Sequence, residues 1–445
     1  MLTTIQNALK TKEIRMKLLY VLIALVIVRI GCNIPIPGTD ASVMQDVFNK
    51  NQSLGFLDVM TGGSFSRMSI FALNITPYIT ASIILQLLTI AIPRLEEMQK
   101  DGEDGRKKIN EYTRYLSIVL AVIEGAAIVI GFRNQNLFNG DSGYTGMIVA
   151  VSALTAGAAF LMWLGEQITE KGVGNGISMI LLINIVARIP NDLSNLYKTY
   201  IATPTDITSK IIAAFIILAI IIAMFVFIIF LQDGERRIPV QYAKKVQGHK
   251  VTGGQSTHIP LKVNTAGVIP VIFASSMMSL PVIIASFAGI QPQTGPDATM
   301  FQKFLTLCNQ SDWCKIGSWG EFKYTLGLLI YIVLVIFFAY FYTSVTFNPL
   351  EISNNMKKQG GFIPGIRPGR PTTEYLTSVL NSIIFLGALG MVIVCTVPIF
   401  FSGAFGADVS FGGTSLIIVV GVVIETIKQI ESLVLVRHYR GFLGN

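Results

Sequence analysis

Ten long apolar segments, separated by shorter polar stretches, dominate the pattern of hydrophobic and polar positions along the chain. A helix needs about 20 mostly apolar residues to cross the hydrocarbon core of a membrane. Lipid offers no partner to an open backbone group, and the alternating pattern of a β-barrel strand is absent, so helices are expected. The ten predicted spans are 18–36, 70–92, 114–132, 145–165, 176–190, 209–231, 265–290, 323–347, 376–400 and 412–432.

One segment interrupts this pattern. Residues 53–69 are half apolar and rich in glycine, and they are too short to span a membrane before the next helix begins. Such a segment is typical of a re-entrant or plugging element, which membrane proteins tolerate where protein or a wet cavity shields the backbone. An ordinary external loop is the alternative, and composition by itself favours that loop.

Proline positions suggest an internal repeat. Pro77 lies in the second predicted span, and Pro270 and Pro281 lie in the seventh. If the spans divide five plus five, the second and seventh occupy corresponding places. Paired proline-interrupted helices are a sequence sign of two inverted halves with the working site between them.

Two long polar stretches, 233–264 and 348–375, contain proline, glycine and β-branched residues. They are expected to form turn-tipped hairpins outside the membrane, with too few apolar residues for a core. Clustered Lys and Arg at an exposed tip indicates an anionic partner, such as RNA phosphate, acidic lipid or an acidic protein face. The alternative is that these charges only enforce topology, which suffices for Lys357 and Lys358. For Arg367 and Arg370, a docking role is at least as well supported.

Composition and charge narrow the class of protein. Hydrophobic residues make up 52% of the chain and charged residues 13%, against about 25% charged in ordinary soluble domains. A water-soluble particle and a disordered chain are therefore both excluded. Of the 34 Lys and Arg residues, 24 lie on the side that carries both termini and 9 on the other, with Arg29 inside the first span. The positive-inside rule then places both termini in the cytoplasm.

Little in the sequence supports catalysis. Phosphate-binding loops and zinc-protease motifs do not occur, and the three histidines lie in or beside polar loops. No enzymatic activity, metal or cofactor is expected. Four cysteines are too few for a disulfide framework, although Cys308 and Cys314 could form one local bridge on an oxidising side. Glu124 lies deep in a span, so a secondary transporter of a small solute remains an alternative.

Eight stretches carry a specific family resemblance. They are RIGCNIPIPGTD (29–40), GGSFSRMSIFALNITPYITASIILQLLT (62–89), DGEDGRKKINEYTRY (101–115), MWLGEQITEKGVGNGIS (162–178), ERRIPVQYAKKVQGHK (235–250), QSTHIPLKVNTAGVIPVIFASS (255–276), NNMKKQGGFIPGIRPGRPT (354–372) and FGGTSLIIVV (411–420). In these stretches the chain resembles the SecY family, also called the translocon alpha-subunit family, the central subunits of bacterial Sec protein-conducting channels. The match runs along nearly the whole chain.

The resemblance implies an all-α polytopic membrane protein of ten transmembrane helices. Two pseudo-symmetric five-helix halves would form a clamshell with a re-entrant plug at about residues 55–68. The halves would be residues 1–190, with helices one to five and the plug, and residues 191–445, with helices six to ten and docking loops 233–264 and 348–375.

The resemblance also implies residue roles. The pore ring would be Ile75, Ile79, Ile177, Leu181, Ile272 and Ile418, with leucine at 181 where the family often has isoleucine. The plug would include Phe56, Leu57, Met60, Gly62, Gly63, Ser64 and Arg67. The lateral gate, between helices two and three and helices seven and eight, would include Thr80, Ile83, Gln86, Asn264 and Ser276. Docking of SecA or the ribosome would use Arg236, Arg237, Lys244, Lys245, Lys250, Arg367 and Arg370.

The function implied is a passive channel in the bacterial cytoplasmic membrane. It would translocate unfolded secretory polypeptides and release transmembrane segments sideways into lipid. Since the chain encodes no energy source, the SecA motor ATPase or a translating ribosome would drive it. Further expected partners are SecE-like and SecG-like small membrane subunits, ribosomal RNA and proteins at the exit site, signal peptides, nascent chains and anionic lipid.

Overall fold

Helices make up most of the computed structural model. It describes residues 10–40, 42, 44, 58, 61–132, 143–198, 207–242, 245–247, 250–252, 256–287, 290, 298–310, 313–314, 323–405 and 413–443. Each of the ten predicted apolar segments coincides with a helix. These helices are α2 (Lys12–Gly31), α5 (Thr76–Ala91), α7 (Glu103–Gly131), α8 (Gly143–Lys171), α9 (Gly176–Leu196), α10 (Ile207–Asp233), α11 (Ile269–Phe287), α14 (Leu326–Thr346), α16 (Arg370–Phe405) and α17 (Gly413–Leu443).

Within the described ranges, four helical stretches are long and apolar enough to cross a membrane. They are Glu103–Gly131, Tyr144–Lys171, Leu326–Lys358 and Arg370–Phe400. A bent pair, Thr76–Thr89 and Pro93–Gln99, turns by 105° and would make a fifth span. Several spans are therefore present. That all ten helices cross the bilayer stays a prediction.

The helix ends differ from the apolar limits. The first helix stops at Gly31 instead of continuing to 36, because Pro35 cannot extend a helix, and Pro35 instead forms a β-bridge with Ser69. The second helix begins at Thr76 instead of 70. Helix α7 starts eleven residues before its predicted span, at Glu103, because water satisfies the polar side chains of a helix that leaves the membrane.

Pro77 and Pro270 do not interrupt their helices, contrary to the sequence prediction. Each is the second residue of its helix, α5 and α11 respectively. Proline fits the first turn because the amide hydrogen it lacks would have no partner there. Only Pro281 lies inside α11. The two helices still correspond, because each begins with proline at the same position.

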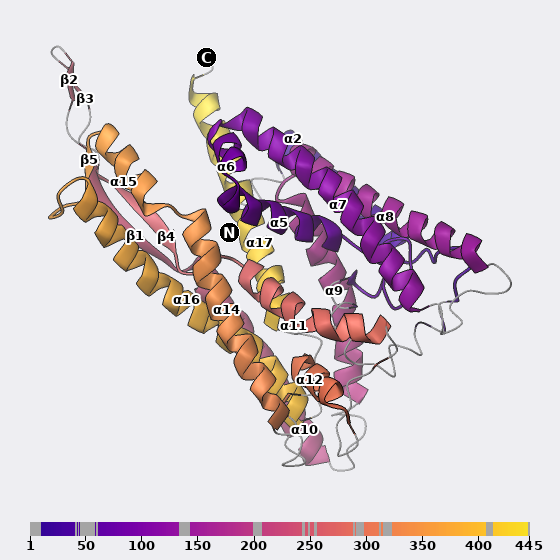
Figure 1. Cartoon of the computed structure of the whole chain (residues 1–445). Helices are drawn as coiled ribbons and strands as arrows, with labels where there is room; N and C mark the ends of the chain where they lie inside the picture. Colours follow the sequence, from indigo (N-terminus) through magenta and orange to yellow (C-terminus); the bar gives the residue numbers. More distant parts are fainter. Residues whose placement is uncertain are drawn as a thin grey trace.

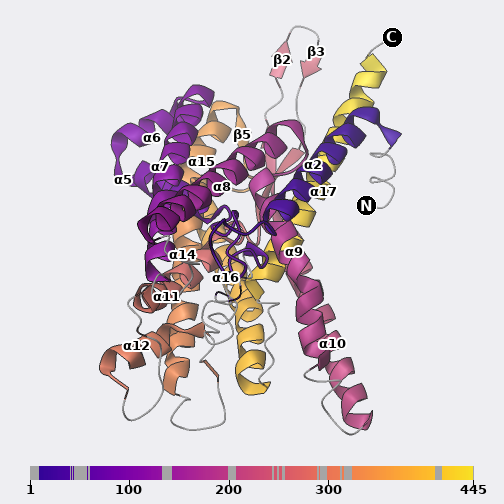
Figure 2. The same cartoon turned by 90° about the vertical axis from the view of Figure 1, so that its right-hand side faces the viewer.

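The helices form two groups (Figures 1 and 2). By their contacts, the first group contains α2, α5, α7, α8 and α9, and the second contains α10, α11, α14, α16 and α17. In Figure 1, α7 and α8 lie on one side and α14 and α16 on the other, with α5, α9, α11 and α17 between them. Contacts between the groups include those of α7 with α11 and of α9 with α17. The first of these contacts joins the third and seventh predicted helices, one from each of the two helix pairs expected to form the gate.

Outside the helical groups lies a small antiparallel sheet. Strand β1 (Glu235–Tyr242) pairs with β4 (Ser256–Lys262) on one side and with β5 (Gly361–Phe362) on the other. Strands β2 (Lys245–Gln247) and β3 (Lys250–Thr252) form a smaller hairpin that projects beyond it. The hairpin prediction for 233–264 is thus confirmed.

The second polar stretch, 348–375, is not a hairpin. It contains helix α15 (Pro349–Lys358), which begins at Asn348, whose side-chain oxygen accepts the backbone N–H of Leu350 at 3.1 Å. Strand β5 follows, and α16 already starts at Arg370. This helix was not predicted from the sequence, because Asn and Pro are common in turns as well as at helix starts.

The prediction that these stretches lack a core is also wrong. Ile238 and Val240 alternate on β1 and are buried against Met356 of α15 and Leu376 of α16. Each stretch is too polar for a core of its own, but together with α16 they form one. Burial of each such side chain contributes about 1.5–3 kcal/mol. This core also contains Ile363, which anchors the loop 363–369 to the helices.

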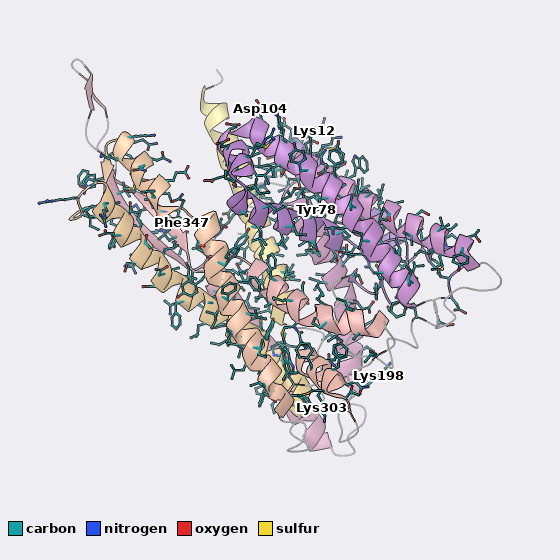
Figure 3. All side chains as sticks on the ribbon, in the orientation of Figure 1. Lys12, Tyr78, Asp104, Lys198, Lys303 and Phe347 are labelled. Atoms are coloured by element: carbon teal, nitrogen blue, oxygen red, sulfur yellow. The ribbon has the colours of Figure 1, made fainter. Side chains whose placement is uncertain are left out.

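The ends of the molecule differ in which loops they carry. Figure 3 shows Lys12 and Asp104 at one end and Lys198 and Lys303 at the other. The sheet, α15 and the last turns of α17 lie at the first end, with Lys12. The segments predicted to be cytoplasmic therefore gather together, opposite those predicted to be external.

Cys308 and Cys314 are free in the structure, and both are buried next to Trp313 in the core of the second group of helices. Burial raises the pKa of both thiols above the usual value, because the charged thiolate is poorly solvated there. The local disulfide considered from the sequence is not formed.

Candidate functional site

The six predicted ring residues come from four helices and meet in one hydrophobic cluster. Ile75 precedes α5 and Ile79 lies in its first turn. Two others lie near the start of α9, and Ile272 and Ile418 lie near the starts of α11 and α17. Ile75 is 1% exposed and Ile418 3%, whereas Ile79 and Ile272 are partly buried. The fold therefore brings side chains from both predicted halves to one place.

The start of α9 is held firmly, which sets the direction of Ile177 and Leu181. The Asn175 side chain accepts the backbone N–H of Ile177 at 3.1 Å, a helix cap. Gly176 lies against the backbone of Gly165 in α8, where any side chain would collide. The close approach of α8 and α9 thus requires glycine.

Chemically, the cluster offers nothing to an ion or to a particular side chain. Its members near the ring are branched or straight apolar residues, and α2 and α8 contribute further ones, such as Val28 and Leu161. An ion entering a pore lined by such side chains would lose its hydration water with no replacing ligand. A collar of this kind can seal against ions and still yield to chains of any sequence.

Residues 61–75, directly before α5, form mostly turns, and most of these residues are buried inside the protein. Phe65 and Met68 pack against α7 and α8 in a second cluster. The backbone bonds to the stretch after α2, with Ile36 N–H donating to Met68 O and Ile70 N–H to Ile34 O, each at 3.0 Å. An exposed external loop does not fit this burial.

Of the predicted plug residues, Phe56, Leu57 and Met60 lie outside the described residues. Gly62 and Ser64 are buried, Gly63 is half-buried and Arg67 is exposed. The Arg67 guanidinium donates a hydrogen bond to the Asn33 side chain.

The predicted gate residues occupy the expected helices with one exception. Thr80, Ile83 and Gln86 follow each other at three-residue steps on α5, and Ser276 is exposed on α11. Asn264 lies before α11, in the turn after β4, and is 5% exposed. Its side-chain amide finds no hydrogen-bond partner within the described structure. A buried amide without a partner makes this turn less stable than a paired one would be.

The predicted docking residues divide into paired and unpaired cations. Arg237 pairs with Glu235 at 2.7 Å and Arg370 with Glu374 at 3.0 Å. Arg236 and Arg367 are exposed. Lys245 and Lys250 lie on the projecting hairpin, with Gln247 opposite Lys250, and Lys244 lies outside the described residues.

Two side-chain hydrogen bonds hold the backbone of the Arg367 tip. Thr372 Oγ1 donates to the Arg367 carbonyl oxygen at 2.8 Å, and Ser353 Oγ donates to the Gly369 carbonyl oxygen at 3.0 Å. Among the described residues, no carboxylate forms an ion pair with the Arg367 side chain. The tip therefore presents an exposed cation at a fixed position.

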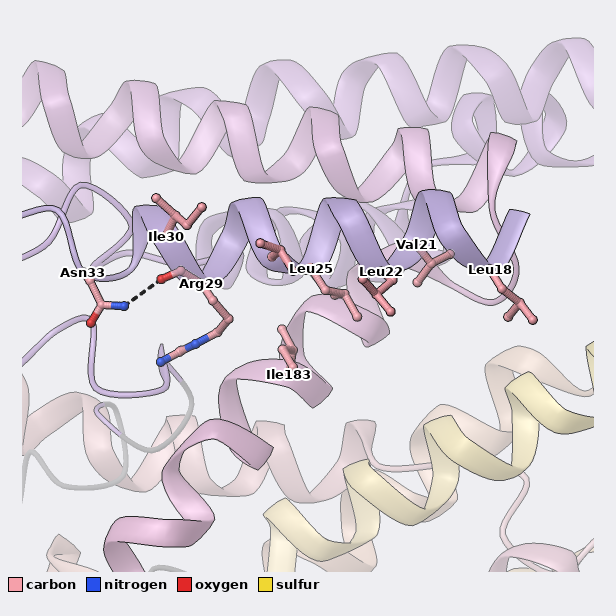
Figure 4. A pocket seen from close by; sticks show the side chains of 9 residues that line it. Leu18, Val21, Leu22, Leu25, Arg29, Ile30, Asn33 and Ile183 are labelled. Carbon is pink, nitrogen blue, oxygen red and sulfur yellow. Dashed lines mark hydrogen bonds between the residues drawn. The ribbon is translucent and has the colours of Figure 1, made fainter. Parts of the chain in front are cut away.

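Arg29, which lies inside the first predicted span, has polar partners within the protein. Its Nη1 atom donates to the carbonyl oxygen of Gly62 and to Oδ1 of Asn184, each at 3.4 Å. Figure 4 shows Arg29 on α2 beside Asn33, at the end of an open groove of about 490 Å³ that also includes Ile183 of α9. The side chain is thus directed into the protein.

Three polar residues near this site were not singled out from the sequence: Asp58, Asn184 and Arg188. Asp58 and Arg188 form an ion pair, and Asn184 is fully buried. The sequence does contain a pattern in α9 that points to two of these residues. Ile177, Leu181, Asn184 and Arg188 follow at steps of four, three and four residues, and this spacing places all four on one helix face.

Comparison with known proteins decides the family. A sequence model of the SecY family matches residues 69–427. The protein translocase subunit SecY of Streptomyces scabiei is 44% identical over 459 aligned residues, covering 100% of both chains. The chain belongs to the SecY family.

Solved structures agree at the level of the fold. A protein-conducting channel is similar with a TM-score of 0.59 at 18% identity, covering 93% of this chain and 91% of that one. Sec61 in the canine ribosome-channel complex has a TM-score of 0.56 at 17% identity with the same coverage. The SecY family is one of membrane-embedded protein-translocation subunits, so the chain shares its architecture with known protein-conducting channels.

Family membership favours a channel over the solute-transporter alternative. Glu124, the residue that supported a transporter, lies half-buried in α7. No basic side chain forms an ion pair with it in the part of the chain that the structure describes. It therefore has no described partner with which to relay a proton.

Proposed function

We propose that this chain is the passive channel-forming subunit of a bacterial protein translocase. It conducts unfolded secretory polypeptides across the cytoplasmic membrane and releases apolar segments sideways into lipid. The convergence of Ile75, Ile79, Ile177, Leu181, Ile272 and Ile418 in one cluster carries the proposal. Apolar side chains from both halves of a SecY-family chain meet there, and they act as the pore ring.

The halves divide near residue 190, and all ten long helices cross the membrane in this proposal. Helices α5 and α7 on one side and α11 and α14 on the other open laterally, with Thr80, Ile83, Gln86, Asn264 and Ser276 along the gate. The contact between α7 and α11 supports this placement. Residues 55–68 act as the plug, which is supported by the burial of Gly62 and Ser64 and by the close approach of Gly62 to Asn184 of α9.

External partners supply the driving force. The tip with Arg367 and the exposed Arg236 suit an anionic surface, and a ribosome or the SecA ATPase docks there. Sec61, a fold relative, is seen in a ribosome-channel complex. SecE-like and SecG-like subunits complete the channel in the membrane.

Reconstitution tests this function. The full chain, purified with its SecE-like and SecG-like subunits and placed in proteoliposomes, should protect an added unfolded secretory protein from protease when SecA and ATP are present. The solubilised complex should also co-sediment with ribosomes at low salt and dissociate at high salt, because exposed charges are screened. Failure of both SecA-driven protection and ribosome binding would contradict the proposal.

Orientation can be tested separately with single cysteines. Gln247 on β2 and Gln359 after α15 belong to the end that carries most Lys and Arg residues. Cysteine at either position, in a cysteine-free background, should react only with reagents that enter the cytoplasm. A cysteine at Lys198 is the matched external control, and it should react with an impermeant reagent added outside intact cells. Labelling of Gln247→Cys and Gln359→Cys by an impermeant reagent outside intact cells would overturn the topology.

A further inference from the structure

The segment that precedes α5 is held by a buried ion pair. The Asp58 carboxylate bonds to the Arg188 guanidinium of α9, and their side chains are 6% and 23% exposed. The other carboxylate oxygen of Asp58 accepts the backbone N–H of Ser66 at 2.9 Å. The Asp58 side chain thus connects two parts of the segment, at positions 58 and 66, and also attaches the segment to α9.

A second set of contacts lies about one helical turn away on α9. The Oδ1 atom of Asn184 accepts from Arg29 at 3.4 Å and from Cys32 Sγ at 3.7 Å. Its Nδ2 atom donates to Oδ1 of Asn74 at 3.2 Å. Asn184 is therefore a fully buried polar residue that connects α2, α9 and the turn before α5.

Gly62 completes this arrangement. Its φ angle is +66°, a conformation that favours glycine, and its α-carbon faces the backbone of Asn184 with no room for a side chain. Its carbonyl oxygen accepts the Arg29 guanidinium that also reaches Asn184. The segment thus lies directly against α9 at this point.

The same helix face carries ring and polar contacts. Ile177 and Leu181 contribute to the apolar cluster, and Asn184 and Arg188 continue that face toward the segment. If the segment moves away from α9, the ion pair between Asp58 and Arg188 breaks. The contact between Asn184 and Gly62 is lost as well. Breaking a buried charge pair is strongly unfavourable unless water or another group replaces the lost partner.

We propose that Asn184 and Arg188 are positioning residues that latch the segment around Asp58 and Gly62 in its resting place, and so determine how readily the channel opens. The inference rests on the proposed channel function. Beyond that function, the proposal is that this polar network, beside the ring, sets the threshold for channel opening. Helix α9 connects the network to the ring.

The test is ion conductance of the full chain, reconstituted with its small subunits in planar bilayers without a translocating polypeptide. Asp58→Asn and Arg188→Gln should each raise the probability of channel opening by about tenfold, because each leaves a buried group without its charged partner. The double variant should be no more open than either single variant, since both remove the same interaction. Arg188→Lys retains the charge and should restore most of the seal.

Glu166→Gln is the matched control. It breaks an ion pair of the first half, Arg114 with Glu166 at 2.6 Å, that does not touch the segment. It should leave the channel as closed as the parent. Asn184→Leu fills the same space without hydrogen bonds and should open the channel as Asp58→Asn does. Thermal unfolding of each variant separates a loosened latch from a misfolded chain, because a variant that folds keeps a cooperative unfolding transition.

Opposite outcomes are distinguishable. If Asp58→Asn, Arg188→Gln and Asn184→Leu all stay as closed as the parent while deletion of residues 58–66 conducts, the latch is wrong and the channel proposal stands. Additive effects of the Asp58 and Arg188 substitutions would also contradict it. If no variant conducts, the deletion included, and the parent fails to import a secretory protein, the proposed function itself fails.

Discussion

Ile79→Asn combined with Ile272→Asn should convert the resting channel into one that leaks ions. Both residues lie in the first turn or so of their helices, two positions after Pro77 and Pro270, and both contribute to the apolar cluster. Asparagine offers hydrogen bonds to water and removes branched bulk, so the collar stays wet. Single-channel conductance without a translocating chain should rise by at least about tenfold, as expected when a hydrophobic constriction hydrates.

The matched control is the double variant with leucine at positions 79 and 272, which keeps the collar apolar and should remain closed. Insertion and assembly should survive in both variants, because Ile79 and Ile272 are only partly buried. Deletion of residues 58–66 should by itself give brief or partial openings. If the asparagine variant is as tight as the parent while the deletion conducts freely, the seal belongs to the plug segment and not to the ring.

Arg367→Glu should impair protein export with the channel still folded and inserted. The side chain is exposed on a tip whose backbone is fixed by Thr372 and Ser353, so its loss removes no packing. Reversing the charge replaces attraction to an anionic partner by repulsion and slows association. We expect the export rate to fall by about tenfold, equivalent to ~1.4 kcal/mol of binding free energy, when secretion is measured in cells at physiological salt.

Lys357→Glu is the control for this prediction. It makes the same charge change on the neighbouring helix α15, where Lys357 is exposed in the last turn, and export should remain close to that of the parent. The Arg367 defect should also grow weaker in ribosome-binding assays at high salt, because both parent and variant lose electrostatic attraction there. Normal secretion by Arg367→Glu would rule out a docking role.

The helices were predictable because a run of about 20 apolar residues has few other options in lipid. Helix limits were less predictable. Hydropathy reports only the apolar part of a helix, so the charged start of α7 and the polar start of α16 were missed. The stretch 70–75 is apolar but non-helical, because Asn74 has a φ angle of +52° and the turns pack against α7 and α8.

The core between the small sheet, α15 and α16 shows a second limit of prediction from sequence. Each polar stretch was judged by itself, and neither has enough apolar residues to bury. Ile238 of β1, Met356 of α15 and Leu376 of α16 become a core only when three distant pieces of chain meet. A pattern within one stretch of sequence cannot show that apolar residues from separate stretches will pack together.

By itself, the sequence determined the helical class, the positions of the apolar segments, the distribution of basic residues and the family resemblance. These are local properties, or sums of local properties, of the chain. Tertiary structure decided which residues meet: six apolar side chains of four helices in one cluster, Asp58 with Arg188 across 130 positions, and Arg29 with Asn184 across 155. The reason is physical, since a charge or amide in a membrane protein takes whatever partner the packing of the helices brings within reach, and that packing depends on the whole chain.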